Sequence, residues 1–208
     1  MERTSQSEEE NGERQLSRML NAMCGDDAPG LARRLIAQYG SLAAVFSQRR
    51  DQLARVVTDI PTAGFLSDVG DTFAAALRFE VARAPIIATS KALVDYLHLA
   101  IGCASSEQFR VLFLNSAQRL IRDEVMSIGT ITHAPVFPRE IIKRALELGA
   151  AAIILVHNHP SGDPQPSKAD IDMTRRIAGA ARCMDIGIYD HIIIARTGWI
   201  SFRALGLL

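Results

Sequence analysis

Apolar side chains between residues 16 and 83 recur three and four positions apart, which is the spacing of amphipathic helices. Leu31 and Leu35 share one face of a predicted helix, and a second helix is predicted over residues 42–46. A third helix is predicted over residues 65–81. This part of the chain is therefore expected to be entirely helical.

The pattern changes after residue 85, where helical segments begin to alternate with short apolar segments. Residues 150–156 form a continuous apolar run, which is typical of a central strand covered on both faces. Residues 86–90 are expected to form a connector. The predicted elements are a helix over 91–101, a hairpin of strands over 109–115 and 119–128, a helix over 138–149, a strand over 150–156, a helix over 167–185, and strands over 186–195 and 199–202. This alternation predicts an α/β (α+β) fold class.

Length and composition agree with such a division. A chain of 208 residues corresponds to one or two domains at about 150 residues per domain. The hydrophobic share of 48% and the charged share of 22% are ordinary for a globular protein. We predict a flexible acidic tail over residues 1–14, a helical module over residues 15–84 and a second domain over residues 85–208.

Charge and cysteine content bear on which classes of partner and metal site the protein can have. The 23 Lys and Arg balance the 23 Asp and Glu, so the net charge gives no overall attraction to phosphate backbones or acidic membranes. No apolar run approaches the roughly 20 residues of a membrane span, and the acidic N-terminus does not resemble a signal peptide. We therefore expect a cytoplasmic protein without a membrane partner. The cysteines form no CxxC pair, and each is predicted to be a small buried hydrophobe; they are Cys24, Cys103 and Cys183.

The chemically informative segment is HNHPSGDPQPSKAD, which spans residues 157–170. His157 and His159 occupy alternate positions of an extended strand, so their side chains project to the same side and can bind one metal ion. The proline-rich loop returns the chain to a helix N-terminus, where Asp170 can supply an anionic ligand. Two histidines and one carboxylate leave the fourth tetrahedral position of Zn²⁺ open for water, which is the catalytic arrangement. Such a water needs a base, and Glu124 is the nearest upstream candidate.

Other interpretations of these residues remain open. Ser167 and Asp170 also form an S-x-x-D capping box, which requires no metal, although one helix end can serve both purposes. His191 is either a satisfied core histidine or a partner that orients a metal ligand. Two further acidic residues compete with Glu124 for the role of base, and they are Asp123 and Glu140.

The segment resembles a known family. The pattern His-x-His, seven residues, Ser, two residues, Asp is similar to the MPN/JAMM metalloprotease signature, formed here by His157, His159, Ser167 and Asp170. With PREIIKRALELGA before it and DHIII after it, the chain resembles the bacterial RadC family over residues 91–208. The resemblance implies an MPN/JAMM-type mixed sheet flanked by helices, with Zn²⁺ bound by the two histidines and the aspartate. It also implies that Glu124 is the general base and that Ser167 helps to polarise a scissile peptide or isopeptide carbonyl.

In that family the N-terminal half resembles a helix-hairpin-helix module, which binds a DNA phosphate through the backbone amides of a Gly-x-Gly turn. This chain reads DIPTAG over residues 59–64, with one glycine, a proline that lacks an N–H group and an acid in front. These departures weaken anion binding by the backbone. Arg49 and Arg50 are the remaining candidates for phosphate contacts.

The leading hypothesis is therefore a zinc-dependent hydrolase of the JAMM type that acts on amide bonds in a peptide or protein substrate. The alternative is a DNA-associated (RadC-like) or non-catalytic binding protein that retains a metal site. A phosphodiesterase fits less well, because nucleases typically use two metal ions and this motif supplies ligands for one.

Overall fold

The computed structural model describes residues 2–86, 91–129 and 136–208. Apart from Ile86, the predicted connector over residues 86–90 lies outside the described residues. The chain divides into two compact units, Met1–Ala74 and Ala75–Leu208, and the division falls within a long helix, before the boundary predicted after residue 84. In the part of the chain that the structure describes, no helix is both long and apolar enough to cross a membrane.

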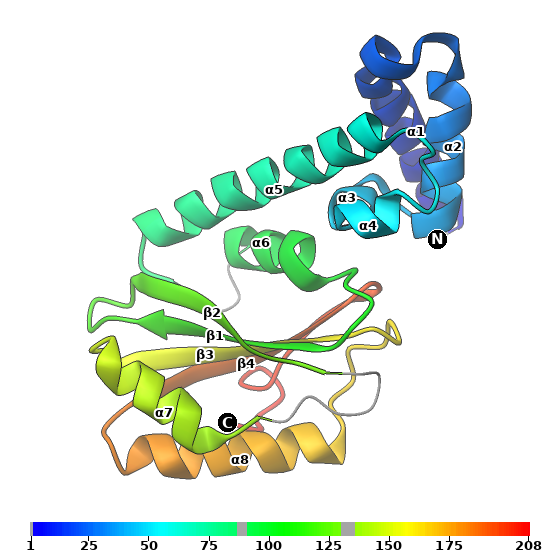
Figure 1. Ribbon diagram of the computed structural model, residues 1–208. Helices are drawn as coiled ribbons and strands as arrows, with labels where there is room; N and C mark the ends of the chain where they lie inside the picture. The colour runs from blue at the N-terminus through cyan, green and yellow to red at the C-terminus, as the bar shows by residue number, and fades with distance from the viewer. Residues whose placement is uncertain (1, 87–90, 130–135) are drawn as a thin grey trace. The chain divides into compact units, whose positions relative to one another are not determined.

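The first unit consists of helices. They are α1 (Glu2–Cys24), the short 3-10 helix η1 (Gly25–Asp27), α2 (Ala28–Tyr39), α3 (Leu42–Phe46), α4 (Arg50–Leu53) and the first part of α5 (Ile60–Arg83) (Figure 1). Gly40, with a φ of 90°, ends α2, because glycine adopts this left-handed conformation without a steric penalty. The Ser41 hydroxyl oxygen then accepts a hydrogen bond from the Ala44 N–H at 3.1 Å and caps α3, as the sequence indicated.

The N-terminal segment departs from its predicted state. Residues 2–14, for which the acidic composition predicts a flexible tail, are the first turns of α1. Gly12, Leu16 and Leu20 are buried at four-residue intervals, so one stripe of this helix faces the rest of the unit. This stripe gives α1 a packed face as far as Gly12, and the residues before Gly12 are mostly polar.

Helix α5 passes very close to α3 within the first unit. A Cβ atom at Gly70 would lie 1.9 Å from the carbonyl oxygen of Phe46, so the two helices can approach only because residue 70 is glycine. Phe73, one turn further along, packs its ring against that of Phe46 with centroids 5.9 Å apart. This contact fixes the short helix α3 against α5.

The second unit is a five-stranded mixed sheet with helices on both faces, which confirms the predicted fold class. Its elements are α6 (Lys91–Ile101), β1 (Gln108–Leu114), β2 (Leu120–Ile128), α7 (Pro138–Glu147), β3 (Ala152–His159), α8 (Lys168–Arg182), β4 (Gly187–Ala195) and β5 (Gly198–Ser201). The strand order is β2-β1-β3-β4-β5, in which only β3 and β4 run parallel. The apolar run of β3 is therefore the central strand.

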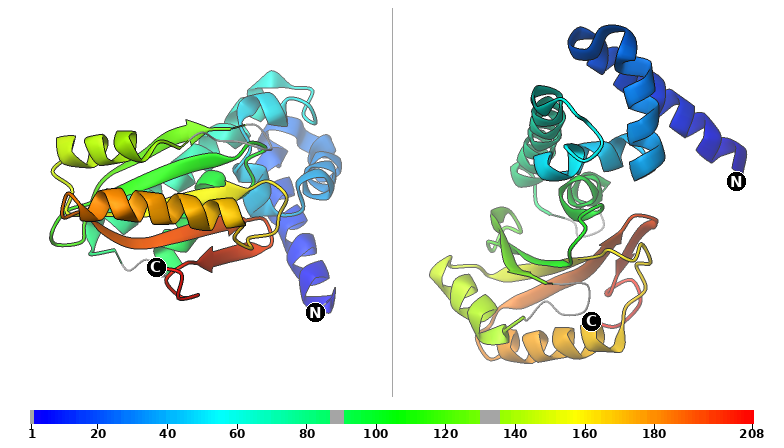
Figure 2. Two further views of the ribbon diagram at one scale, coloured as in Figure 1. Left: turned by 90° about the horizontal axis from the view of Figure 1, so that it is seen from below. Right: turned by 45° about the vertical axis from the view of Figure 1, so that its right-hand side comes forward.

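Alternation along β3 sends its side chains into two separate cores. Ile154 and Val156 pack with α6 on one face, whereas Ile153 and Leu155 pack with α7 and α8 on the other. Figures 1 and 2 show α7 and α8 on the face of the sheet opposite to α6. The same alternation places the next odd-numbered residue, His157, on the face covered by α7 and α8.

The predicted burial of the cysteines does not hold in full. Cys24 and Cys103 are half-buried, and Cys183 is exposed. Cys183 is the C-cap residue of α8, where the helix leaves its packed face and the chain turns towards β4.

Candidate metal centre

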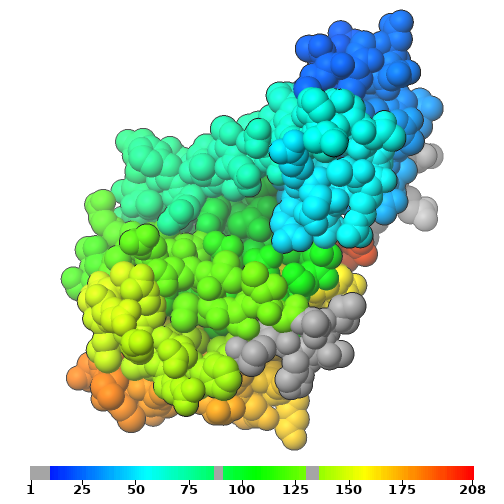
Figure 3. Space-filling view, in the orientation of Figure 1, coloured from blue at the N-terminus to red at the C-terminus, as the bar shows by residue number. Residues whose placement is uncertain are grey.

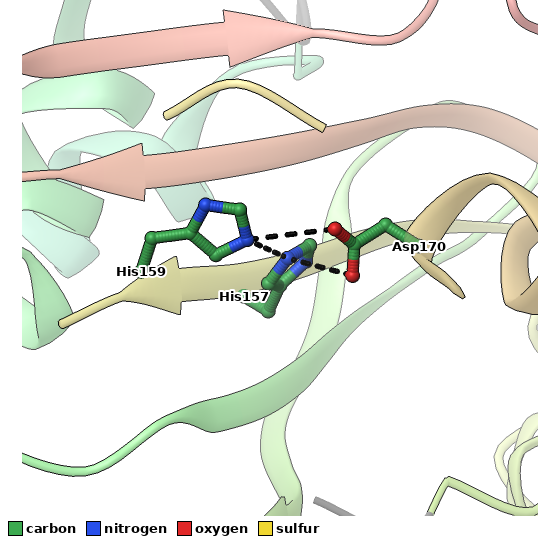
Figure 4. Close-up of side chains that lie close together, drawn as sticks. All are labelled: His157, His159 and Asp170. Atoms are coloured by element: carbon green, nitrogen blue, oxygen red, sulfur yellow. Dashed lines mark hydrogen bonds and ion pairs between the residues drawn. The ribbon is translucent and has the colours of Figure 1, made fainter. Parts of the chain in front are cut away.

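Two histidines lie at the end of the central strand. His157 is level with Phe109 of β1 and Ile193 of β4, and His159 projects to the same side one repeat later. The loop after β3 leads into α8, whose first turn contains Asp170. Figure 4 shows the imidazoles of both histidines and the carboxylate of Asp170 pointing towards one another. The structure thus brings together all three predicted ligands.

The separations of the ligand atoms suit a single ion. His157 Nε2 lies 3.0 Å from His159 Nε2 and 3.3 Å from Asp170 Oδ1, and His159 Nε2 lies 3.5 Å from Asp170 Oδ2. A tetrahedral zinc ion with bonds of about 2.0–2.1 Å would hold its ligand atoms about 3.3 Å apart. The His157 side chain is fully buried, whereas that of His159 is 16% exposed, so the cluster opens to solvent on the His159 side.

The contacts of His159 and Asp170 leave acceptor atoms facing one another. A backbone carbonyl can only accept a hydrogen bond, so the 2.7 Å contact with Asp163 O places a proton on Nδ1 of His159 and, in the neutral ring, a lone pair on Nε2. Burial acts to raise the pKa of Asp170, but its contacts with His157 and His159 outweigh this effect and hold that pKa well below its usual range. In the neutral ring, this lone pair faces the Asp170 carboxylate, and a cation between the two groups would attract both of them. The donor set therefore fits a metal ion.

His191 of β4 lies directly behind the first ligand. Its Nε2 is 2.7 Å from His157 Nδ1, and its Nδ1 is 2.6 Å from the Thr174 hydroxyl oxygen. Burial holds the pKa of His191 well below its ordinary value, so the ring is neutral. Both ring nitrogens of His191 thus have partners, and one partner is a predicted metal ligand, so the contacts fit both interpretations left open by the sequence.

Ser167 caps the helix that carries the third ligand. Its hydroxyl oxygen accepts a hydrogen bond from the Asp170 N–H at 3.2 Å, and Asp170 Oδ2 accepts one from the Ser167 N–H at 2.8 Å. This capping box fixes the Asp170 carboxylate while leaving Oδ1 directed at His157. Ser167 is exposed, and as a cap its hydroxyl acts only as an acceptor, so its proton remains available to a substrate.

Glu124, the predicted base, lies elsewhere on the same face of the sheet. It is level with Val111 of β1, and through that strand with Leu155 of β3. At about 4.8 Å per strand, β2 is roughly 10 Å from β3. Both carboxylate oxygens of Glu124 accept hydrogen bonds from Arg144 of α7, and this pairing lowers the pKa of Glu124. The structure does not bring Glu124 to the three metal ligands.

The two competing acids are also engaged away from the cluster. Asp123 accepts hydrogen bonds from Arg110 and Tyr96, the latter a residue of α6 on the opposite face of the sheet. Glu140 is exposed in the first turn of α7 and pairs with its neighbour Arg139 at 3.2 Å. Neither carboxylate points at the histidines.

An acid that the sequence analysis did not single out lies close to the open side of the cluster. Glu107 directly precedes β1, and continuing the register of Phe109 with His157 by two residues would bring Glu107 level with His159 on the same face. The pKa of His159 is raised first by its contact with Asp170, and the charge of Glu107 adds to this increase. An acid directly before the strand that pairs with the His-x-His strand is the signal that could have identified it.

Asn158 holds this acid-bearing segment in place. Its side chain points away from the two histidines, and its Oδ1 accepts a hydrogen bond from the Gln108 N–H at 2.8 Å. Its amide group donates to the Ser106 carbonyl oxygen at 3.2 Å. The residue between the two histidines therefore fixes the backbone on both sides of Glu107.

The fold and this cluster define an α+β domain whose central strand ends at a His/Asp cluster that could hold a metal ion. A family model, the RadC-like JAB domain, matches residues 87–207, which is more than half of the chain. The chain therefore belongs to the RadC family, with a domain of the MPN (JAB) type. This match confirms the resemblance that the segment 157–170 indicated.

Proposed function

We propose that this protein is a zinc-dependent hydrolase of amide bonds in peptides or isopeptide-linked proteins. The observation that carries the proposal is the convergence of two imidazole nitrogens and one carboxylate, 3.0–3.5 Å apart, at the solvent-facing end of a buried strand. Three protein ligands leave a fourth position for water, as in catalytic zinc sites. Imidazole and carboxylate donors at tetrahedral spacing favour zinc over the harder ions magnesium and calcium.

Each group at the cluster would have a separate role in amide hydrolysis. A zinc ion bound by the cluster would lower the pKa of a water molecule and polarise the substrate carbonyl. The neighbouring carboxylate would accept a proton from the attacking water and pass it to the leaving nitrogen. The Ser167 hydroxyl would donate a hydrogen bond to the carbonyl oxygen as negative charge develops there.

We assign the role of base to Glu107 in place of Glu124. Glu107 lies beside the exposed ligand His159, with which it interacts electrostatically. Glu124 would have to break a two-point ion pair with Arg144 and reach across a strand. The register of the sheet therefore supports Glu107.

The alternative of DNA binding receives less support from the N-terminal unit. The Asp59 carboxylate accepts hydrogen bonds from the Thr62 N–H at 2.9 Å and from its hydroxyl at 2.6 Å, at the start of α5. A phosphate approaching these amides would meet the charge of Asp59. The other alternative is a binding protein that retains the metal but does not catalyse hydrolysis. The following experiment distinguishes it from a hydrolase.

The test combines metal analysis with hydrolysis of two substrate pools. Tag-free protein is loaded with Zn²⁺, and its metal content is measured beside that of His159→Ala. Both proteins are then incubated with a proteome-derived peptide pool and with a pool of peptides joined through the lysine side chain, and new termini are identified by mass spectrometry. We expect about one zinc per chain and cleavage in at least one pool, both lost in His159→Ala.

Two carboxylate variants identify the base. Glu107→Gln should retain zinc and lose roughly 10²- to 10⁴-fold in rate, because it removes general-base catalysis. Glu124→Gln is the matched control and should retain both zinc and activity. A zinc-loaded protein that leaves both pools intact, or cleavage that survives in His159→Ala, would contradict the proposed function.

A further inference from the structure

We propose that Thr174 and His191 form a hydrogen-bond relay that fixes His157 as the tautomer protonated on Nδ1 and thereby presents its Nε2 lone pair to the metal. The purpose of the relay rests on the proposed function, but its hydrogen bonds join groups of the protein alone and can be measured without a bound metal. Thr174 and His191 are both positioning residues, because neither contacts the metal position itself.

The direction of the relay is set at its far end. The Thr174 hydroxyl donates its single proton to the carbonyl oxygen of Asp170 at 2.6 Å, since a carbonyl can only accept. The same hydroxyl oxygen is 2.6 Å from His191 Nδ1, so this second contact requires His191 to be the donor. The proton of the His191 ring is thereby placed on Nδ1.

The position of the proton on His191 determines the position of the proton on His157. His191 is fully buried, which disfavours a charged ring, and a neutral ring protonated on Nδ1 carries a lone pair on Nε2. That lone pair lies 2.7 Å from His157 Nδ1, which must then carry the proton of the His157 ring. The His157 Nε2 atom is left with a lone pair, 3.0 Å from the Nε2 atom of His159.

This assignment explains why a cation would stabilise the site. The Asp163 carbonyl fixes the proton of His159 on Nδ1, and the relay fixes that of His157 on Nδ1, so neither Nε2 atom can donate to the other. When both rings are neutral, a positive ion between them would stabilise their close approach to each other and to the Asp170 carboxylate.

The relay also connects two ligands that come from different elements. It begins on the backbone of Asp170 in α8, passes through His191 of β4 and ends on the ring of His157 in β3. All the side chains along it are buried, and the His191 ring packs against Phe202 with centroids 4.5 Å apart. Helix α8 is thus held in register with the strand that carries the histidines.

The test measures tautomers in the metal-free protein and metal affinity separately. Ring ¹⁵N shifts, read by long-range ¹H–¹⁵N correlation at about pH 8, where ordinary histidines are neutral, distinguish protonated from unprotonated nitrogens. We expect Nδ1–H for both His157 and His191 in the wild type. In Thr174→Val, the proton of His191 should no longer be confined to Nδ1. The same variant should bind Zn²⁺ or Co²⁺ about 10- to 100-fold more weakly in a competition assay. Thr174→Ser should restore both properties.

Thr72→Val is the matched control, because the Thr72 hydroxyl also donates to the carbonyl four residues earlier, that of Asp68, but on an exposed surface of α5. If Thr174→Val does not fold, His191→Phe replaces it, because it removes the acceptor for His157. It should likewise free the His157 tautomer and weaken metal binding. Finding His157 protonated on Nε2 in the wild type, or tautomers and affinity unchanged in Thr174→Val, would overturn the relay. If the tautomers are as expected and no metal binds, the proposed function fails and the relay stands.

Discussion

Arg144 of α7 holds both carboxylate oxygens of Glu124 on β2, with Nη2 2.7 Å from Oε1 and Nε 2.8 Å from Oε2. Parallel contacts of this kind are the strongest arrangement of a guanidinium and a carboxylate. Strand β2 is an edge of the sheet, and the elements around the pair are at the surface in Figure 3. The pair therefore ties an edge strand to the helix beside it.

Replacing this carboxylate should affect stability and leave the metal site unchanged. Glu124→Gln should lower the free energy of unfolding by about 1–2 kcal/mol at pH 7, because it replaces a charge-assisted pair with a neutral contact. Since Arg144 lowers the pKa of Glu124, the stabilisation is complete above the unfolded-state pKa of about 4.3 and is lost as the pH falls through the lower folded-state value. Denaturant unfolding at pH 7 and pH 3 should therefore show a difference that shrinks on acidification.

Glu140→Gln serves as the comparison, because that residue is exposed and pairs with its exposed neighbour Arg139. Its effect on unfolding should be within about 0.5 kcal/mol. A Glu124→Gln variant that folds normally, retains zinc and yet loses hydrolysis would restore Glu124 as the base.

The predicted and observed parts of the site differ in how far apart they lie in the sequence. His157, His159 and Asp170 could be predicted because strand, loop and helix cap follow one another within a single segment. Glu107 is fifty residues upstream of His157 and reaches the site only because β1 pairs antiparallel with β3 in one particular register. Periodicity predicts strands, but it does not specify which residues of separate strands lie side by side.

The fold shows a similar distinction. Helix α6 begins and ends at the predicted residues, because a strongly amphipathic pattern defines both its start and its length. The start of α1 was not predicted, because the residues before Gly12 are mostly polar. The burial of Gly12 near Leu42 is a tertiary contact, and local composition does not encode it.

Capping and metal binding by Asp170 can be separated with two substitutions. Asp170→Asn retains an oxygen that can accept from the Ser167 N–H, but it removes the charge that a metal ion needs. We expect it to abolish zinc binding at micromolar concentrations and to change the unfolding of the metal-free protein only slightly. Ser167→Ala should do the reverse, costing about 1 kcal/mol of stability while zinc remains bound. Calorimetric titration measures zinc binding, and denaturant unfolding measures stability. If both variants lost zinc affinity and stability to the same extent, this separation would be contradicted.

Removing the metal should lower the thermal stability of the second unit. A ligand that binds only the folded state stabilises it by about 2.7 kcal/mol when its free concentration is 100 times its Kd. Zinc should therefore raise the unfolding temperature of the wild type by several degrees, and a chelator should reverse the shift. His159→Ala should show no such response to zinc. Because the ligands must be deprotonated, the shift should also decrease as the pH falls. An equal response in the wild type and the variant would place the zinc elsewhere on the protein.

The buried carboxylate on the opposite face of the sheet should matter for stability alone. Arg110 donates to both oxygens of Asp123 at 3.0 and 2.9 Å, and the Tyr96 hydroxyl donates to the same carboxylate. Burial, followed by the charge of Asp123, raises the pKa of Tyr96, so the hydroxyl keeps its proton. Asp123→Ala would leave the Arg110 charge with only 15% of its side chain exposed and no carboxylate partner.

We therefore expect Asp123→Ala to reduce the free energy of unfolding by about 3–5 kcal/mol. Tyr96→Phe removes one hydrogen bond to the same carboxylate and should cost only about 1–2 kcal/mol. Denaturant unfolding gives both values, and zinc titration of the folded variants should give the affinity of the wild type, because the metal ligands project from the other face of the sheet. A loss of zinc affinity in well-folded Tyr96→Phe would show that the two faces are energetically coupled through β1, the strand that pairs with both Asp123 and His157.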